Sequence, residues 1–488
     1  MAPPPSGESS SSASTSDQPE TLTFYPFAYA LLDDELDTHC WYCLAATRDE
    51  HKLLRCTACH AAWFCSRACQ ELGWFDHKPE CKALKRIKAA NEMNGGAAAG
   101  MPGVEVRHLG RIASRHKLIT DGKDTPTDKF YLNRTSRRTI MQLWSHAEDI
   151  RRDPPALKKF EDIYAQLTCL YSTKDLPDKE TVYQLHCRNY INRHAISDLD
   201  YLREIGKGLY LDLCAYDHSC RPNTIYTCDG FIATLRPLHA GVNITSTTTT
   251  FYSYIDLLNT KQQRRKLLKD TWYFDCQCDR CVDEDEQVLS SVTCEHCHAP
   301  VVLFGSRAVR DVDRFVFVCA KCDTPCTKDR VTGAIAAMRH IDTVTQNDQI
   351  DQADSPLDFV QDLLSRYAGL LPRVNVYFAR LLQAAIRHTA STSHADLLQL
   401  HLAACDCLYV CFPNNHPALA YHHMSIGLMA NKCNQADVAE SHLTTAIAML
   451  TTSLGEEHQM TKLAQTHLQQ CVTQKHSGAR IVSTKASD

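Results

Sequence analysis

The chain has 488 residues, of which 44% are hydrophobic and 22% charged, a composition that is typical of globular proteins and excludes a fibrous or wholly disordered chain. Its formal net charge of −5 provides no global basic field, so direct nucleic-acid binding is not expected to dominate. No apolar run reaches the roughly 18 to 20 residues that a membrane span needs, so we expect a soluble protein without membrane contact.

The chain begins with a segment rich in Pro and Ser, residues 1–20, which we expect to be a disordered leader. This segment lacks the basic and then apolar run of a secretory signal, so we expect reduced cysteines in the nucleus and cytoplasm. From Thr21 to Leu32 apolar and polar residues alternate, which predicts a strand.

Eight potential soft-metal ligands follow, in pairs whose spacing is typical of zinc sites. The pairs are Cys40-x2-Cys43, Cys56-x2-Cys59, Cys65-x3-Cys69 and His77-x3-Cys81. So short a segment cannot build a sufficient core, so metal binding would supply most of its folding energy, on the order of 10 kcal/mol per site. Disulfides and inert buried cysteines are the alternatives. The spacing disfavours inert cysteines, and the lack of a secretory signal before the cluster disfavours disulfides.

The order of the pairs favours interleaved ligand sets. The simplest assignment of ligands places Cys40, Cys43, Cys65 and Cys69 on one ion and Cys56, Cys59, His77 and Cys81 on the other. This stretch resembles the MYND zinc finger, whose pattern ends in the run found here from Phe64 to Cys81. The resemblance implies structural zinc and a shallow groove for peptides, often proline-rich ones.

Helical and strand-like segments alternate after the finger. A Gly- and Ala-rich connection spans Ala89 to Gly103, and helical apolar spacing from Arg107 to about Asp175 predicts an inserted helical subdomain. From Gly206 to Tyr254 the chain is strand-like and rich in turn residues. Beyond Gly333 it is helical to about Thr473.

The C-terminal helices contain an internal echo. Asn415-His416-Pro417 and Glu457-His458-Gln459 each precede a helix, 42 residues apart. An ordinary helical bundle and an irregular TPR-like superhelix both fit this pattern, and we favour the TPR-like arrangement.

A second cysteine cluster, Cys276-x-Cys278-x2-Cys281, is one ligand short of a closed zinc site. Cys220, 56 residues upstream in Asp217-His218-Ser219-Cys220, completes four ligands. The metal would then clamp Asp217 and His218 to the region of Phe274.

Two further pairs, Cys294-x2-Cys297 and Cys319-x2-Cys322, lie 21 residues apart with apolar residues between them. This pattern predicts a zinc ribbon with a structural role, and Cys326 is a spare potential ligand. Reduced surface cysteines are the alternative.

The segments around the second cluster resemble a SET domain with its post-SET segment. Ser253 to Leu258 and the run from Tyr273 to Cys281 match the closing SET and post-SET pattern. With the finger inserted, the chain resembles the SMYD family of protein lysine methyltransferases over about Glu20 to Thr473. Asn192 and Ser145-His146 stand where that family binds S-adenosylmethionine.

The resemblance implies roles for individual residues. Tyr254 would carry its phenol at the lysine channel and Phe274 would stack on the adenine. His146, Asn192, Asp217 and His218 would be further contacts to the cofactor. A lysine with a pKa near 10.4 loses its proton at pH 7 at a cost of about 4.6 kcal/mol, which an apolar channel beside a sulfonium lowers.

Three departures from the family pattern count against an intact enzyme. The early Gly-x-Gly turn has no counterpart, because Gly7 is the one glycine before Thr21. Asp217 stands where Asn is usual, and its charge would repel the cofactor's carboxylate. Gly241-Val242-Asn243 replaces Gly-Glu-Glu, and Thr245 to Thr250 is an insertion, either a bulge or an artefact of sequence assembly.

Together these features predict an α+β fold: a SET β-fold interrupted by a MYND finger and a helical insert, a zinc-bound post-SET segment and an α-helical TPR-like C-terminal lobe. The expected parts are the leader (1–20), the first part of SET (21–39), the finger (40–81), the helical insert (82–185), core SET (186–258), post-SET (259–285), the zinc-ribbon-like insert (286–330), the TPR-like domain (331–475) and a disordered tail (476–488).

The predicted function is S-adenosylmethionine-dependent methylation of lysines in histones or other proteins, with three or four Zn²⁺ ions. The alternative is a catalytically impaired MYND and TPR-like zinc scaffold that binds proline-rich partners in transcriptional regulation. Asn192, His218, Tyr254 and Phe274 favour the enzyme, whereas Asp217 and the missing Gly-x-Gly favour the scaffold.

Overall fold

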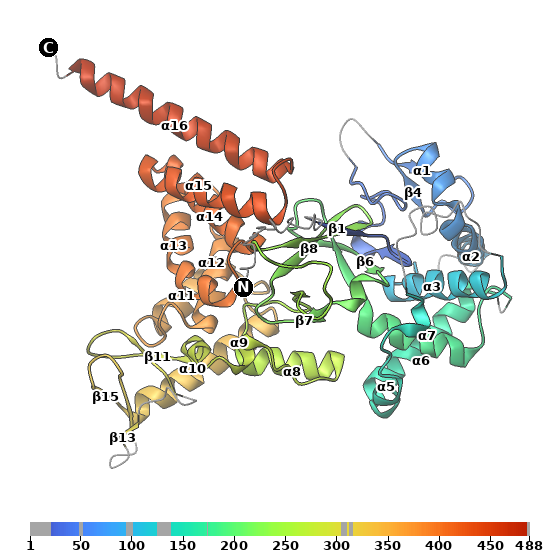
Figure 1. The fold of residues 1–488 in the computed structure, drawn as a ribbon, viewed down its shortest axis with the longest axis horizontal. Helices are drawn as coiled ribbons and strands as arrows, with labels where there is room; N and C mark the ends of the chain where they lie inside the picture. Colours follow the sequence, from blue (N-terminus) through green and yellow to red (C-terminus); the bar gives the residue numbers. More distant parts are fainter. Residues whose placement is uncertain are drawn as a thin grey trace, which may run out of the picture.

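Strands from distant parts of the sequence form small sheets at the centre of the molecule, between the finger and helical insert on one side and the C-terminal helices on the other (Figure 1). The computed structural model describes residues 21–47, 52–93, 101–123, 138–172, 174–303, 310–311 and 316–485. The predicted α+β class is confirmed. The predicted leader, residues 1–20, and part of the Gly- and Ala-rich connection lie outside the described residues.

Three small sheets make up the centre. One has the order β1-β9-β8, the second β2-β6-β5, and in the third β10 pairs in parallel with β7. Their bounds are β1 (Leu22–Phe24), β2 (Ala28–Leu31), β5 (His194–Ser197), β6 (Glu204–Leu209), β7 (Asp217–His218), β8 (Thr224–Asp229), β9 (Ile232–Pro237) and β10 (Phe251–Tyr252).

The single strand predicted from Thr21 to Leu32 is wrong, because the segment forms β1 and β2 in two different sheets. Leu22 pairs with Leu235 in β9, whereas Ala28 pairs with Leu209 in β6. The break falls at Pro26, which has no N–H to give to a ladder.

The finger is built from β3 (Leu54–Arg55), β4 (Trp63–Phe64), α1 (Arg67–Leu72) and α2 (Trp74–Met93). It touches the central sheet at the tight turn between β8 and β9. Gly230 in that turn has φ +56°, and a Cβ there would lie 2.3 Å from the carbonyl oxygen of Cys43. Glycine is therefore required twice over, for the left-handed backbone and for the close approach of the finger.

The helical insert consists of α3 (Val104–Thr120), α5 (Ala147–Arg152), α6 (Pro154–Leu170) and α7 (Lys179–Asn192). Three buried arginines, spaced four residues apart on α3, form an arginine ladder: each pairs with a carboxylate of a neighbouring segment. The pairs are Arg107 with Asp33 (2.5 Å), Arg111 with Glu80 (2.5 Å) and Arg115 with Asp76 (2.8 Å). Glu80 and Asp76 belong to α2, so the ladder joins the insert to the finger.

A buried histidine beside the ladder gives a pH-dependent prediction. His108 on α3 donates from Nε2 to the carbonyl oxygen of Ala28 (3.1 Å), and burial lowers its pKa to about 3. Since an unfolded histidine has a pKa of about 6.5, the unfolded state binds more protons below that pH. The resulting loss of stability begins as the pH falls through about 6.5 and continues toward the folded pKa.

We expect His108→Gln, whose amide can donate to the same carbonyl, to flatten the decrease in the free energy of unfolding between pH 7.5 and 5.5. The wild-type curve should be steeper by up to about 1.4 kcal/mol per pH unit below pH 6.5. Urea unfolding at each pH measures the difference, and zinc release affects both proteins alike. Parallel curves for the two proteins would contradict the assignment of a buried neutral His108.

The segment from residue 261 to residue 326, which contains the second cysteine cluster and the last two cysteine pairs, follows the central sheets. It contains α8 (Lys261–Trp272), α9 (Asp279–Val282), β11 (Val292–Thr293), β12 (Pro300–Val301), β13 (Arg310–Asp311), β14 (Val316–Val318) and β15 (Pro325–Cys326). Short 3-10 turns are η1 (Asp33–Glu35), η2 (Ile140–Gln142), η3 (Leu213–Ala215) and η4 (Asp285–Ser290).

The C-terminal lobe is a stack of helices (Figure 1). They are α10 (Lys328–Gln346), α11 (Pro356–Tyr367), α12 (Val376–His388), α13 (His394–Cys411), α14 (Pro417–Lys432), α15 (Ala436–Ser453) and α16 (Gln459–Lys485). In this stack α10 packs on α12, and from α11 onward each helix packs on the next. His416 and His458, which precede α14 and α16, make the same hydrogen bond at the start of their helix. The Nδ1 of His416 accepts from the backbone amide of Ala418, and the Nδ1 of His458 accepts from the backbone amide of Met460.

The helix α16 runs to Lys485 and extends away from the lobe (Figure 1), so it continues into residues 476–485, for which the sequence predicts a disordered tail. None of the helices in the described part of the chain is both long and apolar enough to cross a membrane.

Candidate functional site

Sixteen cysteine and histidine side chains gather into four groups, and in each group the four potential ligand atoms lie within 4.8 Å of one another. The groups are Cys40, Cys43, Cys65, Cys69; Cys56, Cys59, His77, Cys81; Cys220, Cys276, Cys278, Cys281; and Cys294, Cys297, Cys319, Cys322. The structure thus brings together the ligand sets proposed from the sequence. The fourth group excludes Cys326, which is buried among apolar residues beside it.

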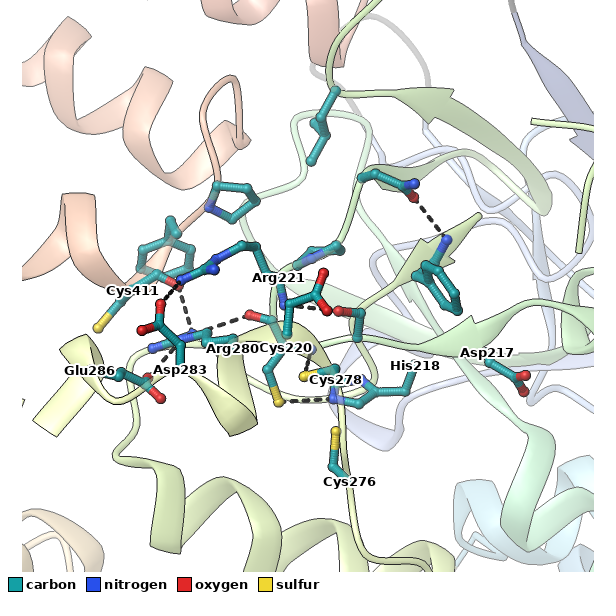
Figure 2. A pocket seen from close by; sticks show the side chains of 18 of the residues that line it. Asp217, His218, Cys220, Arg221, Cys276, Cys278, Arg280, Asp283, Glu286 and Cys411 are labelled. Carbon is teal, nitrogen blue, oxygen red and sulfur yellow. Dashed lines mark hydrogen bonds and ion pairs between the residues drawn. The ribbon is translucent and has the colours of Figure 1, made fainter. Parts of the chain in front are cut away.

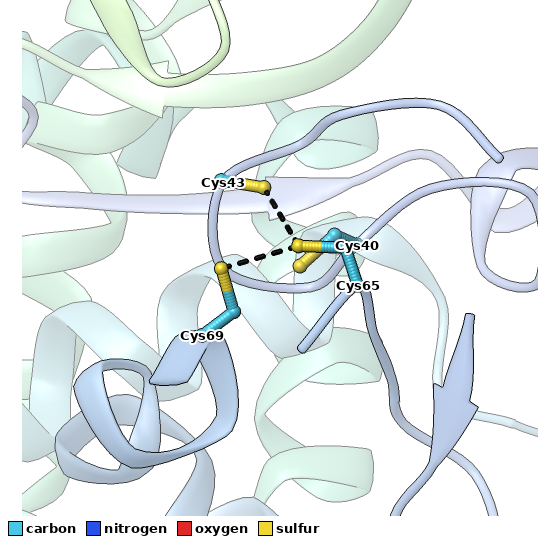
Figure 3. A group of neighbouring side chains, drawn as sticks. All are labelled: Cys40, Cys43, Cys65 and Cys69. Atoms are coloured by element: carbon cyan, nitrogen blue, oxygen red, sulfur yellow. Dashed lines mark hydrogen bonds between the residues drawn. The ribbon is translucent and has the colours of Figure 1, made fainter. Parts of the chain in front are cut away.

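The donors in these groups fit Zn²⁺. Two thiolates at about 2.3 Å from a tetrahedral ion are about 3.8 Å apart. Sulfur separations here are 3.6 Å for Cys43 and Cys65 and 3.9 Å for Cys56 and Cys81. Figure 3 shows the first group, in which all four sulfurs point toward a common centre. In the second group His77 turns Nε2 toward Cys59 (3.6 Å), while its Nδ1 lies 3.9 Å from Glu80.

The third group is joined to distant parts of the chain by two buried arginines. Arg264 on α8 pairs with Glu286 and approaches the sulfur of Cys281 (3.9 Å). A zinc ion with four thiolates carries a net charge of about −2, so the nearby guanidinium offsets negative charge that would otherwise be buried.

Arg280, which stands between Cys278 and Cys281 in the sequence, is also buried (Figure 2). Its Nη1 donates to the carbonyl oxygens of Cys220 (3.3 Å), Leu257 (3.1 Å) and Cys411 (2.7 Å), and its Nε donates to Glu286 (2.7 Å). Cys411 ends α13, so one side chain connects the third group, the segment that contains Leu257 and the C-terminal lobe.

Two hollows meet beside the third group. The larger is a cleft of about 1590 Å³ between residues 274–288, the loops around residues 217–223 and 248–254, and the end of α13. The smaller is a cavity of about 200 Å³ between the insert and the central strands. Asp217, Tyr254 and Phe274 line both, so a molecule in the cavity and a chain in the cleft would meet at these side chains.

Three further residues that the sequence singled out are placed as follows. His146 and Asn192 line the cavity, and His146 stacks on Tyr273 with ring centres 5.5 Å apart. The amide nitrogen of Asn192 donates to the carbonyl oxygens of Trp144 (2.7 Å) and Arg188 (2.8 Å), which orients its Oδ1. His218 lines the cleft, not the cavity.

The ring of His218 links Tyr254 to the third group. Its Nδ1 accepts from the backbone amide of Tyr254 (3.0 Å), so the ring hydrogen of the neutral imidazole lies on Nε2. Nε2 then donates to the sulfur of Cys220 (3.2 Å; Figure 2). A histidine in this position couples a metal ligand to the backbone that carries Tyr254.

Tyr254 is held as a neutral phenol. Burial raises its pKa, and its hydroxyl donates to the carbonyl oxygen of Tyr216 (2.9 Å). The rings of Tyr252 and Trp272 lie 5.1 Å and 5.6 Å from its ring centre. The phenol oxygen therefore keeps lone pairs for a ligand in a largely aromatic surrounding.

The sequence reasoning missed several cavity residues. His194 bonds through Nε2 to the hydroxyl of Tyr252 (2.7 Å), and both line the cavity with Tyr226 and Trp272. For Tyr252 the available signal was its place in an apolar strand segment, two positions before Tyr254.

The Thr-rich insertion forms a hydrogen-bonded loop at the rim of the cleft. The hydroxyl of Thr250 donates to the carbonyl oxygen of Asn243 (2.8 Å). The side-chain amide of Asn223 donates to the carbonyl oxygen of Thr249 (2.8 Å). Thr248 and Thr249 line the cleft, so the insertion shapes its entrance.

Comparison with known proteins gives matches in keeping with this geometry. Residues 40–81 match the MYND finger family. The chain is 23% identical to human histone-lysine N-methyltransferase SMYD3 over 439 residues, which cover 89% of this chain and 88% of the relative. SET domain-containing protein 14 of Caenorhabditis elegans is 28% identical over 281 residues, 57% of this chain and 59% of the relative. N-lysine methyltransferase SMYD2 of Sus scrofa is 28% identical over 293 residues, 59% of this chain and 60% of the relative.

Proposed function

We propose that this chain, which belongs to the SMYD family of SET and MYND proteins, is an S-adenosylmethionine-dependent protein-lysine N-methyltransferase acting on histone or other protein lysines. One observation carries the proposal: Asp217, Tyr254 and Phe274 line both the small cavity and the large cleft. A cofactor in the cavity and a peptide in the cleft would come together at the phenol of Tyr254.

The side chains around the cavity carry chemical groups that suit the parts of S-adenosylmethionine. The Oδ1 of Asn192 suits the ammonium of its amino-acid end, and Phe274 offers a ring face to the adenine. His146, stacked on Tyr273, closes the cavity from the insert. When bound, S-adenosylmethionine supplies a methyl group on a sulfonium.

The remaining chemistry belongs to the chain. Burial between Tyr252, Tyr254 and Trp272 removes water from an entering ammonium, and this loss of hydration lowers the pKa of the lysine. The lysine loses its proton to water in the cleft before it enters. Tyr254 then accepts a hydrogen bond from the neutral amine and aligns its lone pair, and such alignment supplies much of the rate acceleration.

A zinc-stabilised scaffold is the second candidate, and Asp217 is the observation that favours it. Its carboxylate sits where the two hollows meet, and it would repel the carboxylate of a bound cofactor. The four metal groups would hold the fold whether or not the pocket works.

We propose partner binding at the finger in either case. Leu54, Leu72 and Trp74 are large apolar side chains exposed on the finger, and they support a role in binding proline-rich peptides. We also propose that the protein acts in the nucleus and cytoplasm.

Calorimetric titration of zinc-replete protein with S-adenosylmethionine and with its demethylated product tests the proposal. Micromolar binding to both ligands is the expected result. Absence of binding in a folded, zinc-loaded sample would favour the scaffold.

The same titration on Asp217→Asn should give tighter binding. The exposed carboxylate repels the cofactor's carboxylate by an amount typical of surface charges, about 0.5 to 1 kcal/mol, so the Kd should fall about two- to fivefold. Asp279→Asn is the matched control, since Asp279 lines the cleft but not the cavity. An equal Kd for Asp217→Asn and wild type would show that Asp217 does not face the cofactor.

A further inference from the structure

Four histidines on three successive helices of the C-terminal lobe face one another in two pairs. His401 on α13 faces His422 on α14 with their Nδ1 atoms 3.1 Å apart, and His423 on α14 faces His442 on α15 with their Nδ1 atoms 2.8 Å apart. These histidine pairs are separate from the four cysteine-containing groups. We propose that each histidine pair is a binding site for a divalent transition metal of the Zn²⁺ type.

The distances suit two ligands of one ion without a change in the helices. Two nitrogens at about 2.0 to 2.1 Å from an ion, subtending about 90° to 110°, lie about 2.8 to 3.4 Å apart. The His401–His422 separation falls within this range, and the His423–His442 separation lies at its lower limit.

The other ring nitrogens of the α14 histidines have the partners that metal-binding histidines need. Nε2 of His422 donates to the carbonyl oxygen of His401 (2.8 Å), and because a carbonyl only accepts, the Nδ1 of His422 carries a lone pair. Nε2 of His423 bonds to the hydroxyl of Tyr409. Such outer hydrogen bonds fix the tautomer and the ring orientation of a metal ligand.

The rings are also in the right protonation state for metal binding. Burial lowers the pKa of His401, His422 and His423 to about 4 and lowers that of His442. Neutral imidazoles bind metals without first releasing a proton. Without metal, each pair can share one N–H···N hydrogen bond, which is the structural alternative that the experiment must exclude.

Each site would be open. Within the described residues, no third Cys, His, Asp or Glu ligand atom joins either pair within the 4.8 Å that defines the four groups, so water would fill the remaining positions. Tyr409, the partner of His423, lines the large cleft. An ion on the second pair would therefore hold α14 to α15 directly behind one wall of the cleft.

The experiment counts zinc in the full-length protein. Wild-type protein equilibrated at micromolar free zinc should hold two equivalents beyond the four that the cysteine-containing groups take. Added zinc should also raise the midpoint of thermal unfolding, because the native state alone presents the pairs. His401→Gln and His442→Gln should each remove one extra equivalent and part of the rise.

His394→Gln, on the same helix as His401 but outside the pairs, is the matched control and should behave as wild type. Zinc K-edge absorption of the wild-type protein provides a readout that needs no variant: the share of nitrogen and oxygen neighbours should rise with the extra equivalents. The proposal is overturned if zinc stops at four equivalents, or if His401→Gln and His442→Gln take up as much zinc as wild type.

Discussion

Tyr254→Phe should reduce methyl transfer by about 10²- to 10³-fold, the usual loss when one positioned hydrogen-bonding group is removed from an active site. Without the hydroxyl, the amine of the substrate loses the group that orients its lone pair. The ring remains, so the walls of the cavity and the cleft keep their shape. Affinity for S-adenosylmethionine should therefore stay within about twofold of wild type, a change below 0.5 kcal/mol.

Transfer of a labelled methyl group to a protein substrate of the wild-type enzyme measures the first effect, and calorimetry measures the second. Tyr367→Phe is the control for the loss of a phenol elsewhere, since Tyr367 bonds to His340 and lines neither the cleft nor the cavity. If Tyr254→Phe transferred methyl groups at the wild-type rate, Tyr254 would not be a catalytic residue. Loss of cofactor binding together with turnover would instead make it a structural residue.

Cys276→Ser should release one zinc ion and loosen the wall shared by the two hollows. A structural zinc contributes about 10 kcal/mol, so loss of one thiolate should cost several kcal/mol of local stability. Phe274 lies two residues away, and the bond from His218 to Cys220 depends on the same group. We expect cofactor binding to disappear and the segment around Phe274 to be cut by proteases under conditions in which wild type resists.

Metal analysis, limited proteolysis and calorimetry on Cys276→Ser test this expectation together. Cys169→Ser is the matched control, since Cys169 is exposed on α6 and lies outside every metal group. If Cys276→Ser kept four zinc ions and full protection, Cys276 and Cys220 would not share an ion.

Local spacing predicted the parts of this molecule that depend on neighbours in sequence. Ligand pairs such as Cys40 and Cys43 or Cys294 and Cys297 are set by two or three intervening residues, and helical apolar spacing identified the insert. Cys220 was found by counting ligands, because three cysteines do not close a zinc site.

Local spacing could not predict contacts between residues that are far apart in the sequence. The bond from Arg280 to the carbonyl of Cys411 spans 131 residues, and no local pattern predicts it. The direction of the His218 ring depends on the amide of Tyr254, 36 residues away, which no local pattern predicts either. Pro26, at which the predicted strand breaks, is present in the sequence. Apolar and polar residues alternate on both sides of it, and this pattern predicted one continuous strand.

The arginine ladder on α3 has a consequence for how the finger holds its metal. Arg111 and Arg115 are paired with α2, the helix that carries His77 and Cys81. If a chelator removed the zinc and α2 melted, two buried guanidinium groups would lose their carboxylates, at about 3 to 5 kcal/mol for each broken pair. The finger and the insert should therefore unfold as one cooperative unit. By linkage, a finger excised from the chain should bind zinc more weakly than the same residues do in the whole protein.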